Sequence, residues 1–205
     1  MERALRVGAA VFNEGDHHAA HDAWEDEWLP LESETSDERL LHGLIQYTAA
    51  VYHARNRNWG GARGLAESAG EYLHEVAPDY RDVNVEAVRT YLGRLAADPE
   101  FAERASPLPL TVGGVAVRAD DLSFEEAAEA AGILAADGER WDENVVEDAA
   151  RYGREEVESG ASTTRFVALL FEFVGGERRG LVYQRLREHT ERRRGREEDV
   201  SGLFE

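Results

Sequence analysis

The sequence predicts a mainly α-helical protein: a multihelical bundle built on an antiparallel helical hairpin, with a small β-hairpin in the C-terminal half. Two observations lead to this fold class. Apolar residues recur at spacings of three and four through most of the chain, which is the period of amphipathic helices. One stretch, residues 108–122, instead has short apolar runs on either side of Gly113-Gly114, a pattern typical of two strands joined by a tight turn.

The first two helices follow from an apolar stripe and from their end signals. Leu5, Ala9 and Phe12 lie on one face of a helix over residues 2–12, and Gly15 supplies the backbone freedom that ends it. Asp16 is then expected to cap a second helix over residues 16–29, before Pro30.

The next three helices complete the first half of the chain. Thr35 and Glu38 form the capping-box pattern at the start of a third helix, residues 36–55. Asn58-Trp59-Gly60-Gly61 interrupts the pattern, and a fourth helix is expected over residues 62–77. A fifth, over residues 85–97, stops at Asp98-Pro99.

A Pro-flanked segment near residues 99–109 predicts two domains, residues 1–105 and 106–205. After the β-hairpin, which is expected to pack on the helices because a lone hairpin is marginal, Ser123 and Glu126 open a capped helix that runs to about Ala136. Further helices are expected over residues 141–158, 162–174 and 177–195. A buried strand is the alternative for RFVALLFEFV, and the Arg/Glu-rich tail is interpreted as an ion-paired helix face.

The charge of the chain is its most unusual bulk property. Asp and Glu number 42 against 23 basic residues, all of them Arg, and the net charge is −19. Such self-repulsion strains a compact fold in dilute buffer and is screened in molar salt. The composition therefore predicts a protein from a high-salt cytoplasm, that of an extreme halophile, and it argues against nucleic acid as a partner.

The absence of cysteine excludes disulfides, thiol catalysis and thiolate metal sites. The N-terminal apolar run is too short for a signal peptide, and no stretch is long enough to cross a membrane. We therefore expect a soluble cytoplasmic protein with no membrane partner.

The candidate site lies on the helical hairpin formed by the second and third helices. His17, His21, Glu25 and Trp28 share one face of the second helix, and His42, Gln46, Ala49 and His53 share one face of the third. In an antiparallel hairpin centred near residue 33, facing residues have numbers that sum to about 66 or 67. His21 is therefore expected opposite Gln46, Glu25 near His42, and His17 near Ala49 and toward His53.

Polar groups that face each other in a helical hairpin must be hydrogen-bonded or bound to a cation. One interpretation is a closed structural network of His21, Glu25 and Gln46 that fixes the register of the hairpin. The other is a functional site. Imidazoles with a carboxylate suit Zn, Fe or Mn, so His17, His21 and Glu25 are the candidate metal ligands. His21, Glu25 and Gln46 are equally the candidate catalytic residues, because a His beside a Glu can act as an acid–base pair.

Trp24 and Trp28 lie on successive turns beside this polar stripe. Because Trp28 continues the stripe of His21 and Glu25, we expect Trp28 to be the buried indole of the two.

Several of these residues carry a resemblance to a known family. Phe12-Asn13-x-Gly15, His21-Asp22-x-Trp24-Glu25-x-x-Trp28, Gly43-Leu44-Ile45-Gln46 and Gly61-Ala62-Arg63 closely resemble the family catalogued as domain of unknown function 309. The resemblance covers about residues 4–75. It implies an all-helical fold of about five helices, and it implies that His21, Glu25, Trp28 and Gln46 are signature positions. It implies no activity.

The chain departs from that family pattern in four places. Asp22 stands where Glu is usual, His17 and His18 stand where aromatic residues are usual, and His42 is outside the pattern. The part after Ser106 is expected to be a C-terminal extension of a halophilic member.

Two classes of function remain open from the sequence. The first is a small-molecule or metal-binding domain, with Asn13, Trp28 and His53 added as candidate cofactor-binding residues. The second is a non-catalytic helical interaction module, with a protein partner or a second copy of the chain bound elsewhere.

Overall fold

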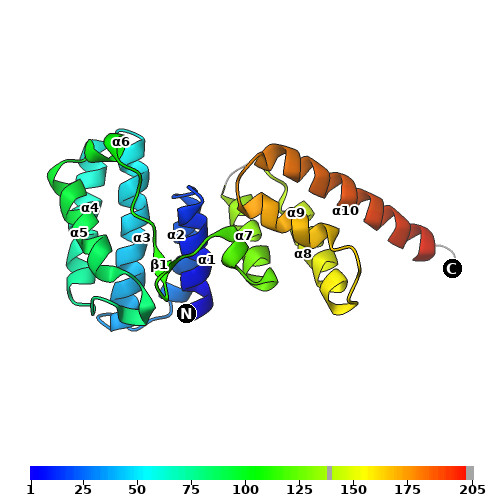
Figure 1. The fold of residues 1–205 in the computed structure, drawn as a ribbon, viewed down its shortest axis with the longest axis horizontal. Helices are drawn as coiled ribbons and strands as arrows, with labels where there is room; N and C mark the ends of the chain where they lie inside the picture. The colour runs from blue at the N-terminus through cyan, green and yellow to red at the C-terminus, as the bar shows by residue number, and fades with distance from the viewer. Residues whose placement is uncertain (138–139, 202–205) are drawn as a thin grey trace. The chain divides into compact units, whose positions relative to one another are not determined.

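The computed structural model describes residues 1–137 and 140–201, and the chain divides into two compact units, Met1–Leu122 and Ser123–Glu205. The mainly helical fold with one small β-hairpin is confirmed (Figure 1). None of the described helices combines the length and apolar character needed to cross a membrane.

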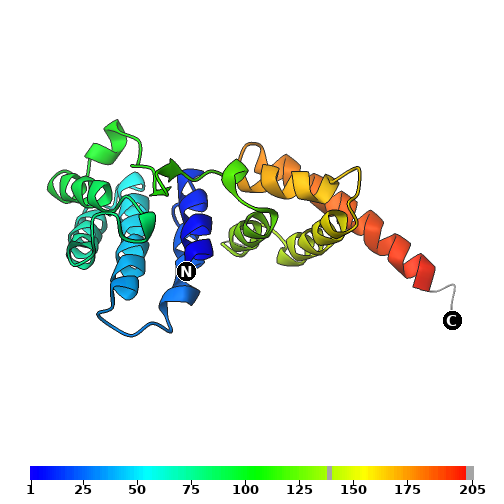
Figure 2. The same ribbon diagram turned by 60° about the horizontal axis from the view of Figure 1, so that its bottom comes forward.

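The first unit is built from six α-helices, two 3-10 turns and a β-hairpin. In chain order these are α1 (Glu2–Asn13), α2 (Ala19–Trp28), α3 (Ser36–Arg55), α4 (Trp59–His74), η1 (Tyr80–Asp82), α5 (Val85–Ala97), α6 (Phe101–Arg104), β1 (Thr111–Val112), β2 (Val115–Ala116) and η2 (Ala119–Asp121). Helix α3 is central, because it packs against α2 on one side and α4 on the other, and α1 and α5 extend the row (Figure 2). The antiparallel hairpin of α2 and α3 is confirmed.

Helix α2 is shorter than the sequence suggested, and this changes what it buries. It begins at Ala19, with Asp16 left in the preceding turn instead of capping it. Its buried residues are Ala19, Ala20, Ala23 and Trp24. The core face of α2 is therefore the alanine and Trp24 face, and the stripe of His21, Glu25 and Trp28 lies beside it.

Helices α3 and α4 begin at side-chain caps. The Thr35 hydroxyl accepts a hydrogen bond from the Glu38 backbone N–H at 3.2 Å, as predicted. The Glu38 carboxylate accepts from the backbone N–H of Glu34 instead of Thr35, so only one half of the expected capping box forms. Asn58 caps α4 by accepting from the Gly61 N–H, and α4 therefore starts at Trp59, earlier than expected.

The predicted β-hairpin forms, with Gly113 and Gly114 at positive φ in its turn. Two asparagine side chains fix the residues around it. Asn13 donates to the carbonyls of Leu110 and Val117 and accepts from the Leu110 N–H. Asn84 accepts from the Thr111 N–H in the same way.

These bonds explain where the first unit ends. The sequence placed a boundary at residues 105–106, in the Pro-flanked segment, whereas the first compact unit extends to Leu122. The intervening residues belong to the first unit because their backbone is hydrogen-bonded to it and because Leu110 and Val117 are buried.

The second unit contains α7 (Phe124–Ala136), α8 (Glu143–Glu158), α9 (Arg165–Val174) and α10 (Arg179–Ser201). Ser123 and Glu126 form the predicted capping box. The apolar stretch that was ambiguous between helix and strand is the helix α9, which packs against α7, α8 and α10. It starts at Arg165 because the Glu156 carboxylate accepts three backbone N–H bonds, from Arg165, Phe166 and Val167.

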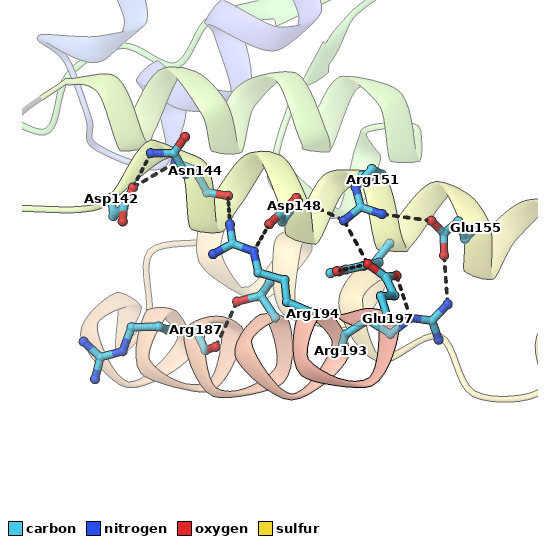
Figure 3. Close-up of polar contacts among 11 residues, drawn as sticks. Asp142, Asn144, Asp148, Arg151, Glu155, Arg187, Arg193, Arg194 and Glu197 are labelled. Carbon is cyan, nitrogen blue, oxygen red and sulfur yellow. Dashed lines mark hydrogen bonds and ion pairs between the residues drawn. The ribbon is translucent and has the colours of Figure 1, made fainter. Parts of the chain in front are cut away.

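The charged tail forms ion pairs, as the sequence indicated, and its partners lie on α8. Arg194 pairs with Asp148, Arg193 bonds Glu155 at 3.0 Å, and Glu197 accepts from the hydroxyl of the buried Tyr152 (Figure 3). Because these side chains span the two helices, they attach the C-terminal half of α10 to α8.

Candidate functional site

The two tryptophans of α2 have the opposite roles to those expected. Trp24 is fully buried, and its indole N–H donates to the Ala4 carbonyl at 2.9 Å. Trp28 is half-buried at the end of the helix. The prediction that Trp28 is the buried indole is wrong because the core face of α2 is defined by Ala20, Ala23 and Trp24.

His21 lies in a small cluster with two acidic residues of its own helix. Its Nε2 is 2.8 Å from Asp22 Oδ1 and 3.9 Å from Glu25 Oε2, and its Nδ1 is 2.7 Å from the His18 carbonyl oxygen. One donor atom from each of His21, Asp22 and Glu25 lies within 4.8 Å of the others. His21 and Asp22 are half-buried and Glu25 is exposed, so the cluster is open to solvent.

Asp22 is the member of this cluster that the sequence reasoning did not select. It was noted only as a departure from the family pattern. Residues i and i+1 do not face each other on a regular helix, so the helical spacing did not pair Asp22 with His21. The contact forms at the first turn of α2, where the His21 ring is held back toward His18. The sequence predicted that α2 begins at Asp16, and the later start at Ala19, which places His21 and Asp22 in the first turn, was not foreseen.

The polar residues of α3 form a second cluster, centred on Glu38. Trp28 Nε1 donates to Glu38 Oε1 at 3.1 Å, and the imidazole Nδ1 of His42 lies 3.1 Å from the same oxygen. Gln46 Nε2 lies 2.9 Å from His42 Nε2. The order of donors is consistent with one tautomer: Gln46 donates to His42, and His42 donates to Glu38.

This arrangement differs from the expected facing pairs. Among the described residues, the hydrogen-bond partner of Gln46 is His42, on its own helix, and not His21. The predicted hairpin register nevertheless agrees with the contact between Trp28 and Glu38, whose numbers sum to 66. The polar stripes meet only at the end of the hairpin near the loop, since Trp24 and the alanines fill the middle.

Glu38 was treated in the sequence only as a capping residue. It is 9% exposed. Burial by itself would raise the pKa of its carboxyl, but hydrogen bonds from Trp28, from His42 and from the Glu34 N–H lower that pKa overall. The stripe of His42 and Gln46, extended by one turn toward the N-terminus, reaches Glu38, and this spacing was the available signal.

A pocket of about 560 Å³ opens beside the Glu38 cluster. It lies between the α2–α3 loop, α3 and α4. Its wall includes Trp28, His42 and Tyr72, and the ring of His42 contacts both of the others, with centroid distances of 4.6 Å to Trp28 and 3.9 Å to Tyr72. Tyr72 had no role in the sequence analysis, because the contact comes from α4.

His17 was a candidate metal ligand in the sequence. In the described part of the chain it does not join the cluster of His21, Asp22 and Glu25. Its ring packs edge-on against Phe12, with centroids 4.9 Å apart. Burial and the nearby Arg55 guanidinium lower the pKa of His17 to about 4, although Asp16 opposes the shift. The imidazole is therefore neutral at pH 7.

The remaining candidate residues make local structural contacts. Asn13 forms the three bonds to the segment around the β-hairpin described above. His53 Nδ1 lies 2.9 Å from Nδ2 of Asn58, the residue that caps α4. The side-chain oxygen of Gln46 is buried without a hydrogen-bond partner among the described residues.

Comparison with known proteins supports the family resemblance. Residues 5–65 match the family model described as Domain of unknown function (DUF309). The match covers α1, α2, α3 and the start of α4, and so includes both polar clusters. No curated protein matches the sequence. The family description names no activity.

Proposed function

We propose that the first unit is a metal-binding helical domain in which His21, Asp22 and Glu25 hold a divalent cation. This keeps two of the three metal ligands expected from the sequence and replaces His17 with Asp22. The half-buried His21 and Asp22 and the exposed Glu25 supply one nitrogen and two carboxylate ligands from one helix, and solvent supplies the remaining positions.

The observation that carries the proposal is the pair of acceptors around the His21 ring. A neutral imidazole has one N–H, yet one ring nitrogen lies 2.7 Å from the His18 carbonyl and the other lies 2.8 Å from the Asp22 carboxylate. A positive charge at Nε2, either a second proton or a metal ion, satisfies both contacts. A His that donates its other N–H to a backbone carbonyl is the usual support for a metal-ligating imidazole.

The chemistry of the ligands points to the class of ion. Imidazole suits Zn²⁺ and Fe²⁺, whereas carboxylates and bound water suit Mn²⁺. The separations of the ligand atoms, 2.8 Å between His21 and Asp22 and 3.9 Å between His21 and Glu25, require the side chains to adjust around a bound ion. Mn²⁺ is the probe of choice, because two of the three protein ligands are carboxylates and solvent reaches the cluster.

The test is a Mn²⁺ titration of metal-free protein followed by electron paramagnetic resonance in molar KCl, where binding to diffuse surface charge is screened. We expect one site per chain. His21→Gln and Asp22→Asn should each weaken it about ten-fold or more. Asp26→Asn is the matched control, because it removes the same charge from an exposed position of α2 outside the cluster. Equal affinities for Asp22→Asn and Asp26→Asn would refute the site.

One observation favours the alternative of a non-catalytic structural or interaction module. The second cluster is a nearly closed network: the Glu38 carboxylate accepts three hydrogen bonds, and both ring nitrogens of His42 are occupied. Such a network fixes the end of the hairpin without needing a ligand. A parent protein that binds no Mn²⁺ would support this reading of both clusters.

A further inference from the structure

The pocket beside Glu38 has a feature that the metal proposal does not use. Its lining includes the carboxylate of Glu38, whose side chain is 12% exposed. Three groups donate to this carboxylate: the Trp28 indole, the Glu34 backbone N–H and the His42 imidazole. These hydrogen bonds orient the Glu38 carboxylate, and the indole and the backbone N–H carry no formal charge.

No arginine in the described part of the chain contacts the Glu38 carboxylate directly. Within the described part of the chain, His42 is the basic side chain within 4.0 Å of Glu38. Arg39 also lines the pocket, but it pairs with Glu75 at 3.6 Å. Glu34 and Glu71 add two more carboxylates to the lining. Four acidic residues, Glu34, Glu38, Glu71 and Glu75, therefore meet one arginine around a single opening, and this excess of negative charge favours a cationic ligand.

The rest of the wall is aromatic. Trp28, His42 and Tyr72 lie ring against ring, and Trp28 and Tyr72 have the negative π-faces that attract organic cations. Both ring nitrogens of His42 are already bonded, to Glu38 and Gln46. His42 therefore contributes its ring to binding and has no free nitrogen for proton transfer to a ligand.

We infer that this pocket is a binding site for a small organic cation, one that carries an ammonium or guanidinium group. The cationic group lies near Glu38 against the Trp28 and Tyr72 rings, and a second positive group on the same molecule reaches the Glu34 and Glu71 rim. This site is separate from the His21 cluster, and it requires no metal. A pocket of about 560 Å³ has the size usual for small-molecule ligands.

The experiment compares two molecules of matched length and opposite charge, 1,4-diaminobutane and butanedioate, by calorimetric titration of the full chain. We expect the diamine to bind and butanedioate to give no measurable heat. Glu38→Gln should weaken diamine binding about ten-fold or more, since it removes a charge-assisted hydrogen bond. Tyr72→Leu should weaken it about two- to thirty-fold through the lost cation–π contact.

Two further variants keep the test decisive. Glu71→Gln and Glu67→Gln remove the same charge from the same helix, but only Glu71 lines this pocket. Binding should weaken for Glu71→Gln and stay within about two-fold for Glu67→Gln, even where Glu38→Gln impairs folding.

Titrating the Asp22→Asn variant separates the inference from the metal site, because the diamine should still bind. Equal binding of both probes, or equal losses in Glu67→Gln and Glu71→Gln, would overturn the inference.

Discussion

The indole of Trp24 fills the space that a side chain on residue 8 would occupy. A Cβ added at Gly8 would overlap the indole ring, and the indole N–H bonds the backbone of α1 at Ala4. Because Gly8 has no side chain, α1 and α2 approach each other closely at this point. The burial of the Trp24 indole depends on this close approach.

The first prediction concerns the stability of this contact. Trp24→Ala should lower the free energy of unfolding by about 3–5 kcal/mol, the usual cost of truncating a buried aromatic. Trp28→Ala should cost less, because Trp28 is half-buried. Gly8→Ala should also destabilise the protein, through overpacking against the indole. Chemical denaturation of the three variants measures this, and a larger loss for Trp28→Ala than for Trp24→Ala would contradict the packing described.

The second prediction concerns the Glu38–His42 pair. Each single variant, Glu38→Gln or His42→Leu, disturbs a mostly buried polar group whose partners stay in place. We expect the double variant to lose less stability than the sum of the two single losses, with a coupling of about 1–3 kcal/mol. A double-mutant cycle of unfolding free energies tests it, and strictly additive losses would show that the pair is not coupled.

The third prediction is a pH dependence of stability from His17. The pKa of His17 falls from its ordinary value of 6.5 to about 4 in the folded chain, so between these values the unfolded chain binds more protons. This contribution to stability is therefore complete above about pH 6.5 and is lost as the pH falls toward 4. His17→Gln should flatten the slope in this window.

A second variant separates the causes of that shift. Arg55→Gln removes the cation that, after burial, contributes most to lowering the pKa of His17. The pKa should rise part of the way toward its ordinary value, and nuclear magnetic resonance of the imidazole follows it directly. An unchanged pKa in Arg55→Gln would leave burial as the sole cause.

The fourth prediction is that folding depends on salt. A net charge of −19 without a single Lys should make the melting temperature rise from dilute buffer to molar KCl. Melting curves recorded by circular dichroism over a KCl series would show this. A melting temperature that does not change over that series would remove the argument for a high-salt cytoplasm.

The fifth prediction concerns the attachment of α10 to α8. Arg193 and Arg194 bond Glu155 and Asp148, and all four side chains are partly open to solvent. Replacing both arginines with Gln should cost about 1 kcal/mol or less in total stability, as expected for exposed pairs. Hydrogen exchange should nevertheless become faster in the C-terminal half of α10 and stay unchanged in α9. Equal exchange in all helices would argue against a local attachment.

Much of the fold follows from local signals in the sequence. The boundaries of α3, α5 and α7 match the expected residues, because Thr35 and Ser123 cap helices through their own side chains and Asp98-Pro99 ends one. The turn at Gly113-Gly114 was equally local. The start of α9 was not, because its cap, Glu156, comes from the preceding helix.

The candidate site was harder to predict because a helical wheel gives spacing and not the direction of the core. His21 and Glu25 were correctly placed together, at 3.9 Å. Whether their stripe faced α3 depended on Trp24, whose burial rests on the contact with Gly8 in another helix. Tyr72 joins the pocket from α4, and no local pattern links it to Trp28 or His42.

The bonds of Asn13 also bear on the order in which the chain can fold. This residue, at the end of α1, is joined to Leu110 and Val117, which follow it by 97 and 104 residues. The end of α1 therefore reaches its final hydrogen bonding only after most of the first unit has been synthesised. Contacts so distant in sequence slow folding, because a long loop must close before they form. The segment that matches the family model, residues 5–65, thus lacks, by itself, the backbone groups of Leu110 and Val117 that the Asn13 side chain binds.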